Sequence, residues 1–497
     1  MTSADYEIVI GLEVHVQLKT ASKLFCGCST QFGADPNTQT CPVCIGLPGS
    51  LPVLNEQAMQ LSLKTAIALN CEIPRFTKWD RKNYFYPDLP KGYQISQFDL
   101  PLSQHGWLLI SDPEGEFEDT RIGIIRAHLE EDAGKSMHDE EAGTADSRID
   151  LNRTGTPLLE IVSEPDIRSP RQARAFLTEL KLLLGYLDVS DCNMQEGSLR
   201  VDANINLHIP ERGEIVATPI VEVKNVNSFR AVERSMLYEA ERQYARWKET
   251  GERLGDVPKQ TRGWDEQAQL TRAQRHKEES SDYRYFPDPD LVPVIVPDER
   301  VKAIQQQIGE LPADLRDRLQ KQYGIGASRA DVIVNQGRPL VDYFIELAEL
   351  SGNAVMAGNW IQQDVLRTLN EQEITIEQFA VAASSLAELL KMIDNGQLDN
   401  SRGRELLQLM IKSGDSLQQA IDSLGIEQVD EKELVELCRQ LVEENPAVVK
   451  DVQAGKQQAI GALIGKARQR NPNVNPGRIK EICLELISEL PSSEEDS

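Results

Sequence analysis

The chain has 497 residues, 40% of them hydrophobic, which is enough for about two to four domains with packed cores. Its formal net charge of −26 argues against non-specific binding to nucleic acid, so any RNA contact must use local basic patches. No apolar run reaches the roughly eighteen residues of a transmembrane helix, and Met1–Glu7 does not resemble a signal or transit peptide, so a cytoplasmic protein without a membrane partner is expected.

The first 295 residues are predicted to be rich in strands. Residues Ile8–Leu18 alternate as a half-buried strand does, with Glu13 and His15 on its polar side. Further strands are expected at Arg121–Glu130, Pro157–Ser163, Gly197–His208 and Ile220–Lys224. Helical patterns interrupt them at Asn55–Leu69, Arg171–Leu184 and Ser228–Thr250. Because strands and helices do not alternate regularly, the sequence predicts an α+β fold.

A proline-rich stretch, Pro287–Pro297, ends the strand-rich part. Beyond it helices are expected at Leu340–Leu350, Ile361–Leu369, Ile376–Ile393 and Arg402–Lys412. A last unit is expected to start near Asp430, where Asp430 and Glu433 fit a capping box, and to close with a helix capped by Asn475 and Pro476. These boundaries predict three domains, residues 1–295, 296–415 and 416–497.

Four of the eight cysteines form two close pairs along the sequence. The spacings Cys26-x-Cys28 and Cys41-x-x-Cys44 fit one tetrahedral zinc site, and the alternative is four reduced thiols in a loop. Because four cysteines fill every position of a tetrahedron, the predicted zinc site is structural.

Carboxylates gather around histidines in three separate segments. Glu13 and His15 share a strand face, an acidic cluster follows in His128–Asp132, and Glu160 lies inside an otherwise apolar strand. A buried carboxylate needs a partner, and oxygen ligands with one histidine suit magnesium bound to nucleotide phosphates. The alternative is a solvated polar strand face. A P-loop is excluded, because Leu129 stands where its first glycine would be.

Aromatic residues are mixed with bases in Trp79–Asp88 and Lys91–Tyr93, and a similar run recurs in Asp282–Asp288. Such mixtures can stack on a base and bind phosphate, and the alternative is a loop that covers a core. Two basic stretches, Arg262–Lys277 and Lys466–Arg470, are candidate RNA contacts. The alternative for both is a solvated helix face.

In combination these motifs resemble the B-subunit family (GatB/GatE) of the tRNA-dependent amidotransferase GatCAB. The resemblance spans nearly the whole chain, and the residues from about 340 to 490 are similar to the GatB/YqeY domain. The motifs that match, besides the cysteine pairs, are Gly11–Leu18, Asp80–Pro90, His128–Lys135, Leu151–Pro165 and Val221–Arg230.

The resemblance implies a cradle-shaped first domain, distantly related to glutamine synthetase and guanido kinases, that binds ATP and magnesium. This domain phosphorylates the side-chain carboxylate of misacylated Glu-tRNA(Gln) or Asp-tRNA(Asn). Ammonia released from glutamine by the partner protein GatA then displaces the phosphate, GatC completes the heterotrimer, and the helical part and its tail hold the tRNA. Phosphoryl transfer needs positioning and cations more than a covalent nucleophile, and the sequence contains no serine or cysteine nucleophile motif.

Matching motifs assign a role to individual residues. The expected catalytic and magnesium-binding residues are His15, Glu131, Glu160 and Glu13, with Asp202 completing the magnesium site. Glu130 stays open as an alternative to Glu131, because strand alternation sets Glu130 beside His128. The expected ATP contacts are Lys82, Tyr84, Tyr86 and Lys91, and the expected zinc ligands are Cys26, Cys28, Cys41 and Cys44.

Two other functions stay open at this point. One is a stand-alone ligase of the glutamine synthetase type, which would act on a free amino acid. The other is a non-enzymatic, zinc-bearing RNA-binding adaptor, which would show no magnesium-dependent ATP hydrolysis. The sequence is compatible with Glu-tRNA(Gln), Asp-tRNA(Asn) or both as substrates.

Overall fold

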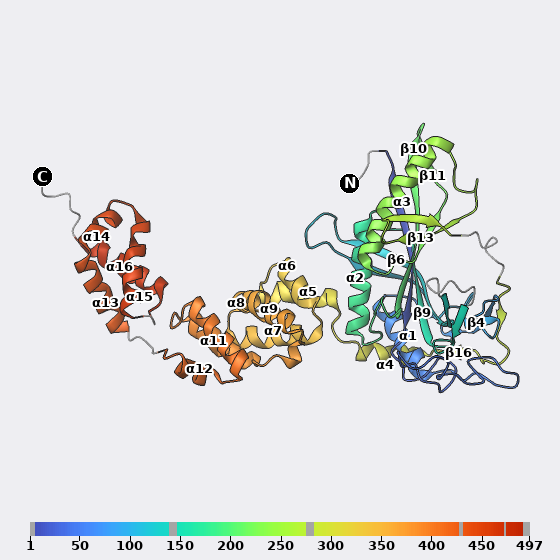
Figure 1. Ribbon diagram of the computed structural model, residues 1–497, viewed down its shortest axis with the longest axis horizontal. Helices are drawn as coiled ribbons and strands as arrows, with labels where there is room; N and C mark the ends of the chain where they lie inside the picture. Colours follow the sequence, from blue (N-terminus) through green and yellow to red (C-terminus); the bar gives the residue numbers. More distant parts are fainter. Residues whose placement is uncertain (1–4, 139–146, 275–282, 427–430, 472–473, 491–497) are drawn as a thin grey trace. The chain divides into compact units, whose positions relative to one another are not determined.

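The computed structural model describes residues 5–138, 147–274, 283–426, 431–471 and 474–490. The chain divides into two compact units, Met1–Asp314 and Leu315–Ser497 (Figure 1). The first unit is rich in strands and the second is helical, so the predicted α+β class is confirmed. Among the described helices none is long and apolar enough to cross a membrane.

A nine-stranded sheet organises the first unit, in the order β14-β13-β12-β10-β1-β9-β6-β5, with β11 paired to β10. All neighbours are antiparallel except β12 and β13. The strands are β1 (Glu7–Gln17), β5 (Ser103–Ile110), β6 (Thr120–Glu131), β9 (Pro157–Ser163), β10 (Leu199–Glu211), β11 (Glu214–Ala217), β12 (Val221–Lys224), β13 (Gln260–Asp265) and β14 (Leu270–Ala273). The sheet therefore contains all five predicted strands.

One face of this sheet is apolar and is covered by helices. Leu12, Val14 and Val16 of β1 are buried in a single core cluster with residues of α1 (Glu56–Ala68), α2 (Pro170–Tyr186) and α3 (Phe229–Thr250). The helix starts follow their sequence signals, since the Ser228 hydroxyl accepts a hydrogen bond from Ala231 N and caps α3. Because strand side chains alternate, the polar residues of β1 lie on the opposite face.

Three smaller sheets accompany the large one. A three-stranded sheet joins β3 (Asp80–Asn83) to β4 (Tyr93–Ser96) and β15 (Phe286–Pro287), while β2 (Phe76–Thr77) pairs with β16 (Val294–Ile295) and β7 (Lys135–His138) with β8 (Ser147–Asp150). The β3–β15 pairing, extended by the 2.9 Å hydrogen bond from Asn83 N to Tyr283 O, brings the two aromatic runs together. The helix α4 (Asp298–Gln307) follows β16.

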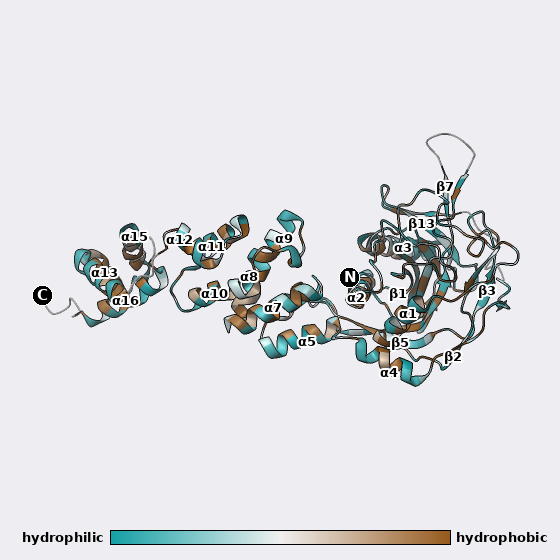
Figure 2. Ribbon diagram, turned by 90° about the horizontal axis from the view of Figure 1, so that it is seen from below, coloured by the Kyte–Doolittle hydropathy of each residue, from teal (hydrophilic) through white to brown (hydrophobic). Residues whose placement is uncertain are grey.

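The second unit consists of helices with one apolar side, and Figure 2 shows brown and teal stripes along α7. Their bounds are α5 (Pro312–Tyr323, which begins in the first unit), α6 (Ala327–Val334), α7 (Arg338–Ser351), α8 (Ala354–Trp360), η1 (Ile361–Val365), α9 (Leu366–Gln372), η2 (Ile376–Gln378), α10 (Ala383–Asp394), α11 (Asn400–Ser413), α12 (Leu417–Ser423), α13 (Glu431–Glu444), α14 (Pro446–Gln453), η3 (Gln457–Ile460), α15 (Gly461–Arg470) and α16 (Pro476–Glu489). The last helices share their own core cluster, which includes the buried Cys438 and Cys483.

The prediction of one helix from Ile376 to Ile393 is wrong. A short 3-10 turn is followed by an extended Phe379, whose ring contacts Tyr343, and the Tyr343 hydroxyl donates a 3.0 Å hydrogen bond to Val381 O. These tertiary contacts interrupt the helical backbone although the apolar spacing continues. The predicted cap of the closing helix is confirmed, since the Asn475 side chain accepts from Gly477 N at 2.8 Å. Asp430 of the predicted capping box lies outside the described residues.

Candidate active site

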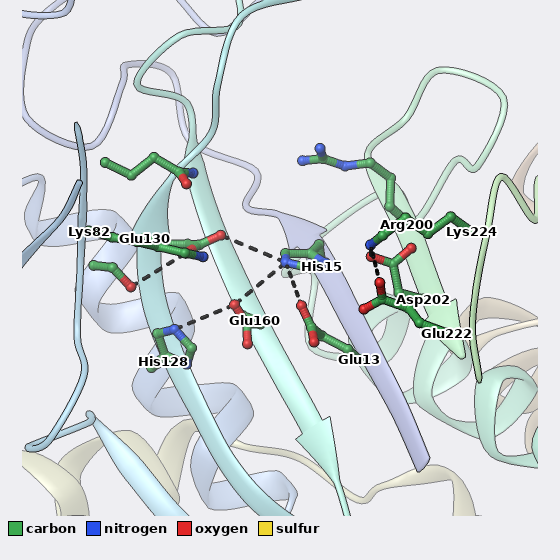
Figure 3. A network of polar contacts seen from close by, with 12 residues as sticks. Glu13, His15, Lys82, His128, Glu130, Glu160, Arg200, Asp202, Glu222 and Lys224 are labelled. Carbon is green, nitrogen blue, oxygen red and sulfur yellow. Dashed lines mark hydrogen bonds and ion pairs between the residues drawn. The ribbon is translucent and has the colours of Figure 1, made fainter. Parts of the chain in front are cut away.

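The face of the nine-stranded sheet opposite α1–α3 carries a row of polar side chains. In the register of the central strands, His15 of β1 lies opposite Glu160 of β9 and Arg200 of β10, and Glu160 lies opposite His128 of β6. Because residues opposite each other on neighbouring strands share a face, these side chains point the same way (Figure 3). Four strands from distant parts of the sequence therefore meet at one site.

A bulge in β6 decides which of its residues join this face. The pairing of β6 with β9 shifts between Ile124 and Arg126. Before the shift, Ile122 and Ile124 point into the core, and after it Ala127 and Leu129 do so. The extra residue thus turns Arg126, His128 and Glu130 onto the polar face, where uninterrupted alternation would have buried them among the helices.

Three carboxylates surround one nitrogen of His15. Its Nε2 lies 3.5 Å from Glu13 Oε1, 3.5 Å from Glu160 Oε2 and 3.7 Å from Glu130 Oε1. The side chains of Glu130 and Glu160 are only 3% and 5% exposed. One imidazole nitrogen and several carboxylate oxygens form a donor set that suits a hard divalent cation such as magnesium.

The electrostatics of this group agree with a cation site. Burial opposes the charged imidazole, but Glu160, Glu130 and Glu13 together raise the pKa of His15 to about 9. Burial alone would raise the pKa of Glu160, yet His128, His15 and Lys82 hold it well below its usual range. Glu160 is therefore charged, and the group as a whole draws a positive charge onto His15, at the position where a metal ion would bind.

Glu131 does not lie in this group, although it is the neighbour of Glu130. As the next residue of β6 it points to the opposite side, where it forms an ion pair with Lys91 Nζ and accepts a 3.0 Å hydrogen bond from Ile95 N. Both side chains are almost fully buried. The geometry therefore brings Glu130, the alternative left open by the sequence, to His15 and Glu160, and it leaves Glu131 and Lys91 in a pair of their own.

Asp202 lies at the other edge of the group. It is opposite Glu13 in the β1–β10 register, and one ligand atom each of Asp202, Glu13 and His15 lies within 4.8 Å of the others. Its carboxylate accepts a 2.5 Å hydrogen bond from Lys224 Nζ, which also lies 3.5 Å from Glu222. Asp202 is thus close to the predicted position, but its carboxylate forms an ion pair with Lys224.

Of the four expected ATP contacts, Lys82 reaches the polar face. Its Nζ lies 3.7 Å from Glu130 Oε2 and 5.3 Å from the centre of the Tyr283 ring. Tyr84 donates a 2.5 Å hydrogen bond to Gln94 Oε1, and its ring contacts those of Tyr86 and Tyr283. Tyr86 is 43% exposed. The two aromatic runs thus form one wall beside Lys82, which their separation in sequence does not reveal.

The four clustered cysteines come together. Their Sγ atoms lie within 4.8 Å of one another, and those of Cys41 and Cys44 are 3.9 Å apart. In a tetrahedral site with zinc–sulfur bonds of about 2.3 Å, neighbouring sulfurs lie about 3.8 Å apart. The buried Lys23 places Nζ 3.7 Å from Cys44 Sγ. Hydrogen bonding with Cys26 and with the Cys41 backbone, followed by the charge of Lys23, lowers the pKa of Cys44 to about 4. The quartet therefore fits a structural zinc ion.

The cysteine loop also contacts the buried Glu131–Lys91 pair. Gly155 has a φ of +83°, and a Cβ atom there would lie 3.4 Å from Cys44 Cβ and 3.6 Å from Glu131 Oε1. A side chain at Gly46 would overlap Lys91. The cluster thus supports the end of β6 from the side opposite His15.

The basic stretches are partly neutralised by local partners. Arg262 lies 3.2 Å from the fully buried Glu239, so it is engaged inside the first unit. In α15, Lys466 Nζ donates to Asn445 at 2.5 Å and Arg470 pairs with Glu444 at 2.5 Å. The end of the predicted stretch Arg262–Lys277, from residue 275, lies outside the described residues.

The sequence is similar to a known family over nearly its whole length. A family model described as the GatB/GatE catalytic domain matches residues 8–302, and one described as the GatB domain matches residues 342–487. The chain is 59% identical to the B subunit of the aspartyl/glutamyl-tRNA(Asn/Gln) amidotransferase of Rhodopirellula baltica, over 97% of each chain. It is 45% identical to the protein of the same name from Moorella thermoacetica, over 97% of this chain and all of that relative (100%).

Proposed function

Because the chain belongs to the GatB/GatE family, we propose that it serves as the B subunit of an aspartyl/glutamyl-tRNA(Asn/Gln) amidotransferase and activates a side-chain carboxylate on misacylated tRNA. The enzyme is an ATP-dependent ligase that uses glutamine as its source of ammonia. The observation that supports a catalytic site in this chain is the group of three carboxylates around His15 Nε2 on one sheet face.

The magnesium ligands in this proposal are His15, Glu130 and Glu160, with Glu13 beside them and Asp202 at the edge. Glu130 takes the place of Glu131, because it is Glu130 that faces His15. Bound magnesium would supply positive charge to the phosphates of ATP as the γ-phosphoryl group leaves. Lys82, 3.7 Å from Glu130, adds a fixed positive charge on the same side.

The reaction needs no covalent intermediate on the protein. A carboxylate oxygen of the aminoacyl side chain forms a bond to the γ-phosphorus, the bond to the β–γ bridging oxygen breaks, and that oxygen keeps the electron pair as ADP leaves. The side chain is already deprotonated, so no proton moves in this step. Ammonia then attacks the acyl phosphate, and the departing phosphate takes the proton that nitrogen loses.

Partners and further ligands follow from the same proposal. The glutaminase GatA and the partner GatC complete a cytoplasmic heterotrimer. Structural zinc is held by Cys26, Cys28, Cys41 and Cys44. ATP lies against Lys82 and the wall around Tyr84. We retain the division into a catalytic domain (1–295), a helical domain (296–415) and a YqeY-like tail that binds tRNA (416–497).

The test uses the complex reconstituted with both partner proteins. Glu160→Ala is expected to lose formation of the acyl phosphate on Glu-tRNA(Gln), trapped with hydroxylamine, while tRNA binding and glutamine hydrolysis without tRNA persist. Lys259→Ala, which removes a half-exposed lysine that pairs with Glu222, is the control and is expected to be near normal. Normal trapping by Glu160→Ala would contradict the site. Amidation of free glutamate by the isolated chain would instead favour a stand-alone ligase.

A further inference from the structure

Arg200 lies on the polar face, although the sequence motifs assign it no role in the site. It is opposite His15 in the β1–β10 register, so both side chains share one face. Figure 3 shows its guanidinium extending from β10 back toward β1, above His15. The arginine therefore places a permanent positive charge on the same face as His15, where it also interacts electrostatically with Glu130.

Asp132, which directly follows β6, holds this guanidinium in place. Its Oδ2 accepts a 2.6 Å hydrogen bond from Arg200 Nη2 and a 2.8 Å hydrogen bond from Gln17 Nε2, and Arg153 Nε lies 3.5 Å away. Asp132 is 2% exposed, and although burial opposes its charge, Arg200 and Arg153 keep its pKa low. A buried carboxylate fixed from three sides leaves Arg200 little freedom.

One donor of Arg200 has no acceptor among the described residues. Its Nε is buried and makes no hydrogen bond within the part of the chain that the structure describes. The ion pair of Arg200 among the described residues is with Asp132, and not with the carboxylates around His15. Buried N–H groups of proteins almost always have an acceptor, so the guanidinium is incompletely satisfied, and the Arg200 side chain, 36% exposed, keeps further donor groups open to a ligand oxygen.

We propose that Arg200 is a catalytic residue that binds the phosphoryl group during its transfer from ATP to the aminoacyl carboxylate. This inference rests on the proposed function. In the transition state the bond from phosphorus to the ADP oxygen is breaking, the bond to the carboxylate oxygen is forming, and charge spreads over the three equatorial oxygens. The planar guanidinium of Arg200, held at one end by Asp132, donates from its free side to these oxygens.

The experiment compares Arg200→Ala and Arg200→Lys in the complex with the partner proteins. For Arg200→Ala the kcat of acyl-phosphate formation is expected to fall about 10³-fold, with the KM values for ATP and tRNA changed only a few-fold. Added guanidinium ion is expected to restore part of the rate. Binding of ATP is expected to persist, whereas binding of ADP with aluminium fluoride, which imitates the transferred group, is expected to be lost.

Arg174→Ala is the control, because it removes an exposed arginine that pairs with Glu233 and leaves Arg200, Asp132 and Arg153 in place. It is expected to stay within about tenfold of the normal kcat. Full activity of Arg200→Lys, or a loss confined to the KM for tRNA, would overturn the role in phosphoryl transfer. If Arg200→Ala forms the acyl phosphate at the normal rate while Glu160→Ala is inactive, this inference alone is refuted. If both variants are normally active, the proposed function is refuted. If Arg200→Ala does not fold, the proposal is decided by the kcat of Arg200→Lys and by its affinity for ADP with aluminium fluoride.

Discussion

The cysteine cluster and the polar face of the sheet are assembled in different ways. All four cysteines lie between residues 26 and 44, so a single loop brings their sulfurs together. The residues around His15 come instead from β1, β6, β9 and β10, and they meet only through strand register and the bulge in β6. The comparison shows that a binding site made within one loop can be read from spacing, while one made across a sheet cannot.

Among the replacements that separate these two regions, Glu130→Gln at the end of β6 is expected to have the largest effect. Glu130→Gln removes a charge 3.7 Å from His15 Nε2, so kcat for carboxyl phosphorylation is expected to fall about 10²–10³-fold. The magnesium concentration for half-maximal activity is expected to rise. Titration of ADP formation with magnesium, in the presence of misacylated tRNA, measures both. An unchanged magnesium dependence would show that Glu130 does not bind the cation.

Glu131→Gln is expected to act on stability. It leaves the buried Lys91 without its carboxylate, and breaking such a pair costs about 3–5 kcal/mol of unfolding free energy. Denaturant unfolding measures this loss, and the folded fraction is expected to keep a nearly normal kcat. The combined replacement Lys91→Met with Glu131→Leu is expected to be milder, because no unpaired charge remains. If Glu131→Gln instead lost as much kcat as Glu130→Gln and kept normal stability, Glu131 would have to be a ligand of the metal.

Cys41→Ser tests whether the cysteine loop acts only as a support. Loss of one sulfur is expected to reduce bound zinc well below one ion per chain and to lower the melting temperature. Because the loop also contacts Lys91 and Gly155, the end of β6 is expected to loosen, with a change in kcat of only a few-fold. Metal analysis and calorimetry check this. Protein purified without chelator that holds no zinc would contradict the site.

Removal of residues 430–497 is expected to have the smallest effect on chemistry. The tail has its own core cluster and carries Lys466 and Arg470, so its loss is expected to raise KM for tRNA about tenfold, or about 1.4 kcal/mol, without changing glutamine hydrolysis. Steady-state kinetics over a range of tRNA concentrations measures the change. An unchanged KM for tRNA would show that the tail does not contribute to tRNA binding.

Much of the fold follows from local patterns in the sequence. The alternation around Leu12 predicted β1, Ser228 marked the start of α3, and Asn475 marked the start of α16. The helix expected at Ile376–Ile393 failed because Tyr343 binds the chain at Val381, a contact that periodicity does not include. Residues such as Arg200 were missed because a charged side chain on a strand gives no sign of what lies opposite it.

The sequence by itself determined the α+β class, the cysteine quartet and the family, because these depend on period, spacing and combined motifs. Only the tertiary structure decided that Glu130 faces His15 while Glu131 pairs with Lys91, and that Arg200 joins them. The physical reason is that one extra residue in β6 reverses which side chains face the core, and that cross-strand neighbours are fixed by long-range pairing.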